Sequence, residues 1–262
     1  MSEAATSMPR AALVTGGAQR IGRAIVEALA ADGYAVAIHH NRSGEAAQAL
    51  AQAIVARGGR AVALGHDLAR DDVADLVRAA AAALGPLTLL VNNASLFERD
   101  DARTMTAASW DRHMAINARA PALLAQAFAA QAPAGADCCV VNLLDQKLWN
   151  QNPDFFSYTA SKVALLGLNT TLAMALAPIR VCGVAPGLTL PSEKMSAESF
   201  ARAHILTPLG RGSTADDVAQ AVRYLACARA VTGDVLLVDG GQHLLRRGRD
   251  VMFEVNPVDG RR

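Results

Sequence analysis

Residues 11–22 read AALVTGGAQRIG, a short apolar run that passes through a glycine-rich turn into a helix-forming segment. A glycine turn between a strand and a helix lets the backbone approach a pyrophosphate, and the helix N-terminus then faces its negative charge. Gly16 and Gly22 suit the tight turn and the close packing of the helix. The turn alone is weak evidence, but its place after the first strand of an alternating pattern favours dinucleotide binding.

Six further apolar runs alternate with Ala-rich helical stretches along the chain. Most are rich in Val, Leu and Ile without polar alternation, as expected of strands covered on both faces. Strands that alternate with helices imply right-handed crossovers and a parallel sheet. We therefore predict an α/β fold, a single Rossmann-type doubly wound domain over residues 1–262, with a seven-stranded parallel sheet and helices on both faces. The predicted strands are 11–15, 35–39, 61–64, 88–92, 138–144, 179–184 and 234–238.

The composition narrows the function classes. The 262 residues carry a net charge of +1, which gives no electrostatic case for a nucleic acid or a membrane surface. The start lacks the apolar segment of a signal peptide, no apolar run reaches transmembrane length, and the four cysteines have no metal-type spacing. We expect a cytoplasmic protein with free thiols, a small-molecule substrate and no metal. The irregular stretch 188–212 is predicted to form a loop or short helices over that substrate.

The end of the second predicted strand indicates which dinucleotide binds. Residues 39–43 read HHNRS and contain no carboxylate, whereas a site that prefers NAD places Asp or Glu there to hold the ribose 2′-hydroxyl. Arg42 instead offers a planar fork that suits a phosphate, and Asn41 and Ser43 add hydrogen-bonding groups. We predict NADPH, the alternative being that Arg42 is a solvated loop residue. Asp67 follows the third strand, where it could accept a hydrogen bond from the adenine amino group or cap the next helix.

Three residues suggest acid–base chemistry. Tyr158 and Lys162 lie one helical turn apart in FSYTASKVALLGL, residues 156–168, and Asp145 lies thirteen residues before the tyrosine. Side chains at i and i+4 share a helix face, and a lysine ammonium beside a phenol lowers its pKa from roughly 10 toward neutrality. Such a phenol can donate or accept a proton during turnover. The alternative is a surface tyrosine with a solvated lysine.

Together these motifs resemble the short-chain dehydrogenase/reductase family over nearly the whole chain. Three departures from its common pattern resemble the pteridine reductase branch. Arg20 replaces a third glycine, and Asp145 replaces the usual serine. Ser95 stands where most members have glycine, and Phe97 follows two residues later. The remaining matches are His39 with Arg42 and Ser43, Asn92-Asn93-Ala94, Asn117, Tyr158 with Lys162, Pro186-Gly187 and residues 238–241, VDGG.

The resemblance implies an NADPH-dependent oxidoreductase that reduces a C=N bond of a pterin-type substrate, such as a dihydropterin, dihydrofolate or a biopterin-like ring. Asp145 would pass a proton through Tyr158 or orient its hydroxyl, and Phe97 would offer a face on which the ring stacks. The implied catalytic group is Asp145, Tyr158, Lys162 and Asn117. The implied cofactor-binding residues are Gly16, Arg20, Ile21, Gly22, His39, Asn41, Arg42, Ser43, Asp67, Leu68, Asn93, Ala94, Ser95, Tyr158, Lys162, Pro186 and Gly187. The implied substrate-binding residues are Arg20, Ser95, Phe97, Asp145, Lys147, Tyr158 and Leu188.

Two other hypotheses stay open from the sequence. One is a reductase of small ketones or other carbonyl compounds that happens to carry Asp145, and the other is an NADPH-binding sensor without turnover. The family resemblance also implies a homotetramer or homodimer, in which the apolar helix 163–176 would pack against its copy. The polar, basic tail 246–262 is expected either to wrap a neighbouring subunit or to be disordered.

Overall fold

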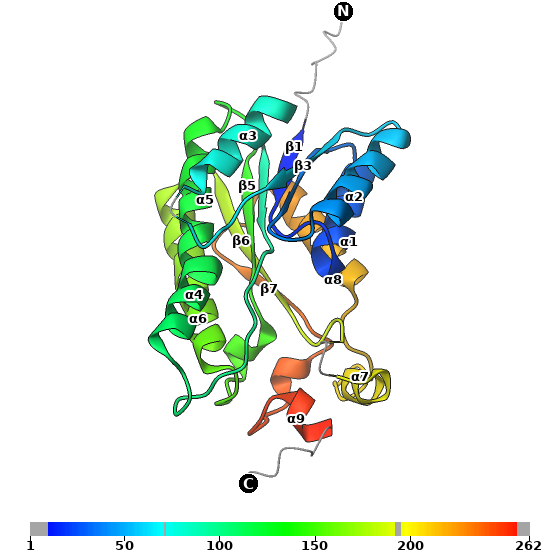
Figure 1. Ribbon diagram of the computed structural model, residues 1–262, viewed down its shortest axis with the longest axis vertical. Helices are drawn as coiled ribbons and strands as arrows, with labels where there is room; N and C mark the ends of the chain where they lie inside the picture. Colours follow the sequence, from blue (N-terminus) through cyan, green and yellow to red (C-terminus); the bar gives the residue numbers. More distant parts are fainter. Residues whose placement is uncertain (1–9, 71, 192–194, 256–262) are drawn as a thin grey trace, which may run out of the picture.

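The computed structural model describes residues 10–70, 72–191 and 195–255, and its centre is one seven-stranded sheet (Figure 1). The strands lie in the order β3-β2-β1-β4-β5-β6-β7, and every neighbouring pair is parallel. The predicted fold class is confirmed, and the strand ends differ from the predicted ones by no more than two residues. The strands are β1 (Ala11–Val14), β2 (Ala35–His40), β3 (Ala61–Gly65), β4 (Leu89–Asn92), β5 (Cys139–Leu143), β6 (Arg180–Pro186) and β7 (Val235–Val238).

The helices cover both faces of the sheet. On one face lie α1 (Arg20–Ala31), α2 (Gly44–Ala56) and α8 (Ala215–Cys227), and on the other lie α3 (Ala74–Leu84), α5 (Ala120–Gln131) and α6 (Phe156–Ala175). Side chains alternate across each strand, so Val14 packs with the first layer and Leu13 with the second. This double burial explains why most strand positions are apolar, with polar residues such as His39 and Asn92 near the strand ends.

The order of the strands places a crevice at the carboxyl edge of the sheet. β1 pairs with β2 on one side and with β4 on the other, so the chain changes direction across the sheet between them. Ligands of open α/β sheets bind at such a switch point, outside the carboxyl ends of the strands. The glycine turn after β1 opens into this crevice.

The C-terminal third adds a small layer beyond this edge. The predicted loop region 188–212 contains α7 (Ala197–His204), and the tail contains α9 (Val251–Val255) after the short η3 (Gln242–Leu244). Helices α7 and α9 pack together below the sheet in Figure 1 through a cluster of Met195, Ala203, Val251 and Val255. Residues 246–255 of the tail therefore contact their own chain, and residues 256–262 lie outside the described part.

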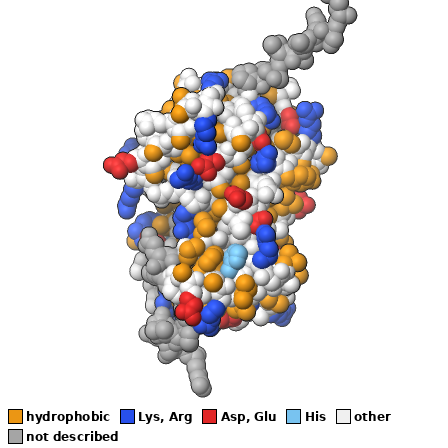
Figure 2. Space-filling view, turned by 90° about the vertical axis from the view of Figure 1, so that its right-hand side faces the viewer, with side chains coloured by type: hydrophobic (Ala, Val, Ile, Leu, Met, Phe, Trp, Pro, Cys, Tyr) orange, Lys and Arg blue, Asp and Glu red, His pale blue; other side chains and the backbone are white. Residues whose placement is uncertain are grey.

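The outer surface agrees with the charge balance of the sequence. On the face that carries α1, α2 and α8, basic and acidic side chains are interspersed (Figure 2). Among the described residues, no helix is both long and apolar enough to cross a bilayer. Cys138, Cys139, Cys182 and Cys227 are free thiols, as predicted, and the last is exposed.

Candidate nucleotide pocket and catalytic group

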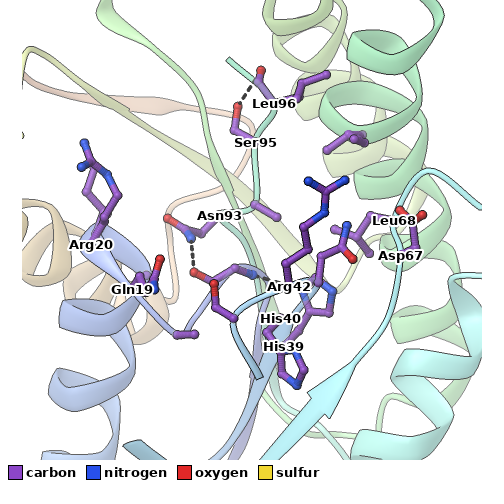
Figure 3. A pocket seen from close by; sticks show the side chains of 18 residues that line it. Gln19, Arg20, His39, His40, Arg42, Asp67, Leu68, Asn93, Ser95 and Leu96 are labelled. Atoms are coloured by element: carbon purple, nitrogen blue, oxygen red, sulfur yellow. Dashed lines mark hydrogen bonds between the residues drawn. The ribbon is translucent and has the colours of Figure 1, made fainter. Parts of the chain in front are cut away.

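A pocket of about 480 Å³ lies at the switch point, between the loops that follow β1, β2, β3 and β4 (Figure 3). Thirteen of the predicted cofactor-binding residues line it: Gly16, Arg20, Ile21, Gly22, His39, Asn41, Arg42, Ser43, Asp67, Leu68, Asn93, Ala94 and Ser95. The sequence analysis missed Ala18, Gln19, His40, Leu96 and Ile116, which also line it. Their residue types carry no chemical signal, and only the closing of the loops brings them to the pocket.

The glycine turn is held in shape by close backbone contacts. Gly16 has φ +61°, and a Cβ on Gly22 would lie 2.1 Å from the carbonyl oxygen of Gly16. The amide of Asn93 donates to the carbonyl oxygens of Thr15 (2.9 Å) and Gly16 (3.1 Å). Asn93 therefore ties the end of β4 to the turn after β1, and side chains at both glycines are excluded by geometry.

Arg20 occupies a backbone position that favours glycine. Its φ is +55°, a conformation that costs a residue with a side chain roughly 1–2 kcal/mol. This explains why glycine is common here in the family that the sequence resembles. The exposed guanidinium donates to the carbonyl oxygen of Pro191 at 2.9 Å, so Arg20 joins the glycine turn to the segment that follows β6.

His39 supports the turn from β2. Its Nδ1 accepts the Gly16 N–H at 3.0 Å, and its Nε2 lies 3.0 Å from the carbonyl oxygen of His66, to which it donates in the neutral ring. Burial lowers the pKa of His39 to about 4, so the ring is neutral at physiological pH. His39 thus fixes the shape of the pocket and places no positive charge in it.

Arg42 and Asp67 lie at the rim near the end of β2. Arg42 is exposed and makes no hydrogen bond or ion pair with any residue that the structure describes, which leaves its whole guanidinium fork open. In Figure 3, Arg42 and Arg20 lie on opposite sides of the pocket. Asp67 accepts the Ala69 N–H at 3.0 Å, which stabilises a local turn after β3.

The phenol of Tyr158 meets the carboxylate of Asp145. Tyr158 lies in the first turn of α6, and its Oη donates to Asp145 Oδ2 at 2.7 Å. The other oxygen of Asp145 accepts the Lys147 N–H at 2.8 Å, because Asp145 is the N-cap of η2 (Gln146–Trp149). The carboxylate is held at both oxygens, so its orientation toward the phenol is fixed.

The predicted lowering of the phenol pKa is wrong for this geometry. Burial raises the pKa of Tyr158 well above its usual value, and the nearby charge of Asp145 raises it further. Lys162 lies 5.8 Å from the centroid of the tyrosine ring and donates to the carbonyl oxygen of Leu143 at 2.6 Å. Burial lowers the pKa of Lys162 to about 8. The phenol is therefore protonated at neutral pH.

Asn117 lies in a break in the helix that leads from α4 (Ala107–Met114) to α5. The break is the π-helical segment η1 (Ala115–Arg119), a type of irregularity that is frequent at functional sites. The buried amide accepts the Leu96 N–H at 2.7 Å and donates to the Ser161 hydroxyl at 3.0 Å. Ser161 in turn donates to the carbonyl oxygen of Tyr158. Asn117 therefore couples the loop after β4 to the helix that carries the phenol.

An aromatic stack lies beside the phenol. Phe97 meets the Tyr158 ring edge-on with centroids 4.7 Å apart, and it stacks on Phe155 at 4.2 Å. Phe155 stacks on Phe253 of α9 at 5.9 Å. Phe97 remains 46% exposed, so part of the ring is still open to a ligand. The sequence analysis missed Phe155 and Phe253, because nothing in their local sequence distinguishes them from core aromatics.

Lys147, a predicted substrate contact, is buried and paired. Its Nζ donates to the carbonyl oxygen of Asp154 at 2.5 Å and lies 3.7 Å from Asp250 Oδ2. The Asp154 carboxylate accepts three hydrogen bonds from Arg249 and one from the Asp250 N–H. These groups fasten the tail to the turn before α6. They lie about a hundred residues apart in sequence, so no local pattern could reveal them.

The remaining predicted residues lie at the end of β6, outside the pocket. Pro186 is the last residue of that strand, and the Gly187 N–H donates to the Val238 carbonyl oxygen at 3.0 Å. The side chain of Leu188 packs against the cluster beneath α7 and α9. The structure therefore places Leu188 in the wall between the sheet edge and the C-terminal layer.

Comparison with known proteins identifies the family. The sequence model of the short chain dehydrogenase family matches residues 10–202. The solved FolM alternative dihydrofolate reductase 1 of Brucella suis, in complex with NADP, is 47% identical with a TM-score of 0.88, over 91% of this chain and 96% of that one. The Brucella canis protein of the same name, also complexed with NADP, is 46% identical with a TM-score of 0.86, over 90% and 95%. An uncharacterized oxidoreductase of Methylorubrum extorquens is 35% identical over 88% of this chain and 97% of its own length.

The chain belongs to the short-chain dehydrogenase family, as its motifs predict. Its structure contains the motifs on which the family resemblance rests: the glycine turn, the asparagine after β4 and the tyrosine–lysine pair of α6.

Proposed function

We propose that this protein is an NADPH-dependent reductase of the pteridine reductase type, which reduces a C=N bond of a dihydropterin such as dihydrofolate. The observation that carries the proposal is the 2.7 Å hydrogen bond from the Tyr158 hydroxyl to Asp145. The likeness to two alternative dihydrofolate reductases, both solved with NADP and both more than 45% identical, supports it.

The nucleotide pocket fits NADPH. The backbone of the glycine turn and the start of α1 suit the pyrophosphate, and the unpaired Arg42 suits the 2′-phosphate. No carboxylate occupies residues 39–43, where NAD-dependent sites hold the ribose hydroxyl. The family resemblance implies that Lys162, whose ammonium donates to the Leu143 carbonyl oxygen, also holds the ribose hydroxyls. When bound, NADPH supplies the hydride.

The protein must supply the matching proton. Tyr158 keeps its phenolic proton at neutral pH because burial and Asp145 raise its pKa. That proton lies between Tyr158 Oη and Asp145 Oδ2, so either atom can present it to a ring nitrogen once the substrate is bound. A serine at position 145 would orient a carbonyl oxygen but is a poor proton reservoir. The partly open Phe97 ring gives a flat heterocycle a surface beside the phenol.

A substrate panel tests the proposal. Dihydrobiopterin, dihydrofolate and a small ketone are each incubated with NADPH, and the loss of reduced-nicotinamide absorbance is followed. We expect turnover of the dihydropterins, and Asp145→Asn should lower kcat by about 10²–10⁴-fold. NADPH affinity, measured by fluorescence titration, should stay unchanged in that variant. Turnover of the ketone alone would refute the proposal, and NADPH binding without turnover of any compound would favour the sensor hypothesis.

Assembly and location are part of the same proposal. The family resemblance implies a homotetramer or homodimer, and the sequence pattern favours the cytoplasm. Two large apolar side chains on α6, Val163 and Met174, are exposed. A self-associating α6 face would cover both of them. Light scattering on the purified protein tests this, and a monomer at micromolar concentration would contradict it.

A further inference from the structure

A second pocket lies at the same edge of the sheet, beyond the catalytic group. It has a volume of about 420 Å³ and a mainly polar lining. One wall follows η2 after β5, and the other follows η3 after β7, so both begin at carboxyl ends of strands. The lining residues are Trp149, Asn150, Gln151, Arg246, Arg247 and Gly248.

Helix η2 connects this pocket to the catalytic group. It begins at the residue after Asp145 and ends at Trp149. A 3₁₀-helix rises about 2.0 Å per residue, so its four residues separate the catalytic carboxylate from the pocket by about 8 Å along the helix axis. The Asn150 amide donates to the Leu245 carbonyl oxygen and joins the two walls. A substrate that reaches past Asp145 along η2 would enter this pocket.

The lining offers one unpaired cation, among the residues that the structure describes, and one aromatic face. Arg247 is engaged, because it pairs with Glu254 and donates to the carbonyl oxygen of Leu206. Arg246 is exposed and has no hydrogen-bond or ion-pair partner within the described ranges. Trp149 is 41% exposed. An aromatic face next to an unpaired guanidinium suits a ligand that carries both a flat ring and a carboxylate.

We propose that this pocket binds the tail of a folate-type substrate, an aminobenzoyl group that ends in carboxylates. The inference rests on the proposed function and narrows it. With the pterin ring beside Phe97 and Tyr158, the benzoyl ring lies along η2 toward Trp149, and the carboxylates reach Arg246. Dihydrofolate, which has this tail, is then bound more tightly than dihydrobiopterin, which lacks it. The pocket acts in specificity and takes no part in proton transfer.

Steady-state kinetics with both substrates tests the proposal. We expect Arg246→Ala and Trp149→Ala each to raise the KM for dihydrofolate about fivefold to tenfold relative to the KM for dihydrobiopterin, with kcat little changed. Arg57→Ala is the matched control, because this exposed arginine at the end of α2 lies at the opposite edge of the sheet. An unchanged ratio of the two KM values in both variants would overturn the inference while leaving the proposed function intact.

A binding measurement separates the two possible failures. Calorimetric titration with p-aminobenzoylglutamate probes the tail alone in the presence of NADP. We expect binding to the unmodified protein that is weakened in Arg246→Ala and retained in Arg57→Ala. No binding to the unmodified protein would overturn the pocket assignment. Binding without turnover of any dihydropterin would contradict the proposed function and preserve the pocket.

Discussion

Replacement of Lys162 by methionine should raise the stability of the protein near neutral pH while abolishing turnover. The Lys162 side chain is 3% exposed, and among the described residues its ammonium has one hydrogen-bond acceptor, the carbonyl oxygen of Leu143. Burial therefore lowers its pKa from 10.5 to about 8. Below pH 8, folding must bury a charged ammonium, and methionine of similar length removes that cost.

The size of the effect follows from linkage. A shift of 10.5 − 8 pH units corresponds to roughly 3 kcal/mol of destabilisation at neutral pH. The unpaired Leu143 carbonyl in the variant offsets about 1–3 kcal/mol of this gain. The change of the stability difference with pH does not include that offset, because the carbonyl does not titrate. Between the two pKa values the unfolded chain retains a proton that the folded protein has lost, so stability rises with pH, and from pH 7.5 to 9.5 the unmodified protein should gain about 2 kcal/mol relative to the variant.

Urea unfolding followed by circular dichroism at the two pH values measures this difference. Lys147→Met is the matched control, because Lys147 is equally buried but paired with Asp250 and the Asp154 carbonyl. Its removal leaves the partly buried Asp250 carboxylate without its cation, with only the Met252 N–H as a donor, and should destabilise the protein by about 1–3 kcal/mol. A stability difference between Lys162→Met and the unmodified protein that stays constant from pH 7.5 to 9.5 would refute the reasoning.

Three further predictions concern the cofactor turn and the tail. Arg42→Ala should raise the KM for NADPH about 10–100-fold and leave the KM for NADH unchanged, because only NADPH carries the phosphate; equal effects would contradict this assignment. Arg20→Gly should raise the free energy of unfolding by about 1 kcal/mol, since its φ is +55°, and a loss of stability would show that the bond to Pro191 outweighs the strain. Burial opposes ionisation of Asp154, but Arg249 and the Asp250 N–H hold its pKa below the usual value. The carboxylate thus stabilises the fold above about pH 4 and loses this effect as pH falls through its folded pKa. Asp154→Asn should therefore lower the melting temperature at pH 7 and weaken the fall of the melting temperature at acidic pH. An unchanged melting temperature at pH 7 would contradict this prediction.

The fold was predictable because each of its elements carries a local signal. Strands buried on both faces are apolar at consecutive positions, and the layers that take up Leu13 and Val14 show why. The sequence analysis did not predict the π-helical segment. Pro121 follows it by two residues and lacks the N–H that would bond to the Asn117 carbonyl, so the chain did carry a local signal.

The candidate site was predictable in its residues and not in its electrostatics. The family resemblance implied that Asp145, thirteen residues before Tyr158, acts on its hydroxyl, and the 2.7 Å contact agrees with this. Helical spacing suggested that Lys162 would lower the pKa of the phenol. The direction is opposite, because helix periodicity fixes which side chains share a face but not how deeply they are buried or where an ammonium finds its acceptor.

The sequence by itself determined the alternating α/β fold, the glycine turn, the absence of a carboxylate after β2, and an acid thirteen residues before the tyrosine. Each of these is a matter of residue type at short range. Only the tertiary structure decided that the phenol is protonated, that Lys147 serves the fold, and that the tail returns to stack Phe253 on Phe155 and to form a pocket with the end of η2. These properties depend on burial and on contacts between segments about a hundred residues apart, which the packing of the whole chain sets and no local pattern encodes.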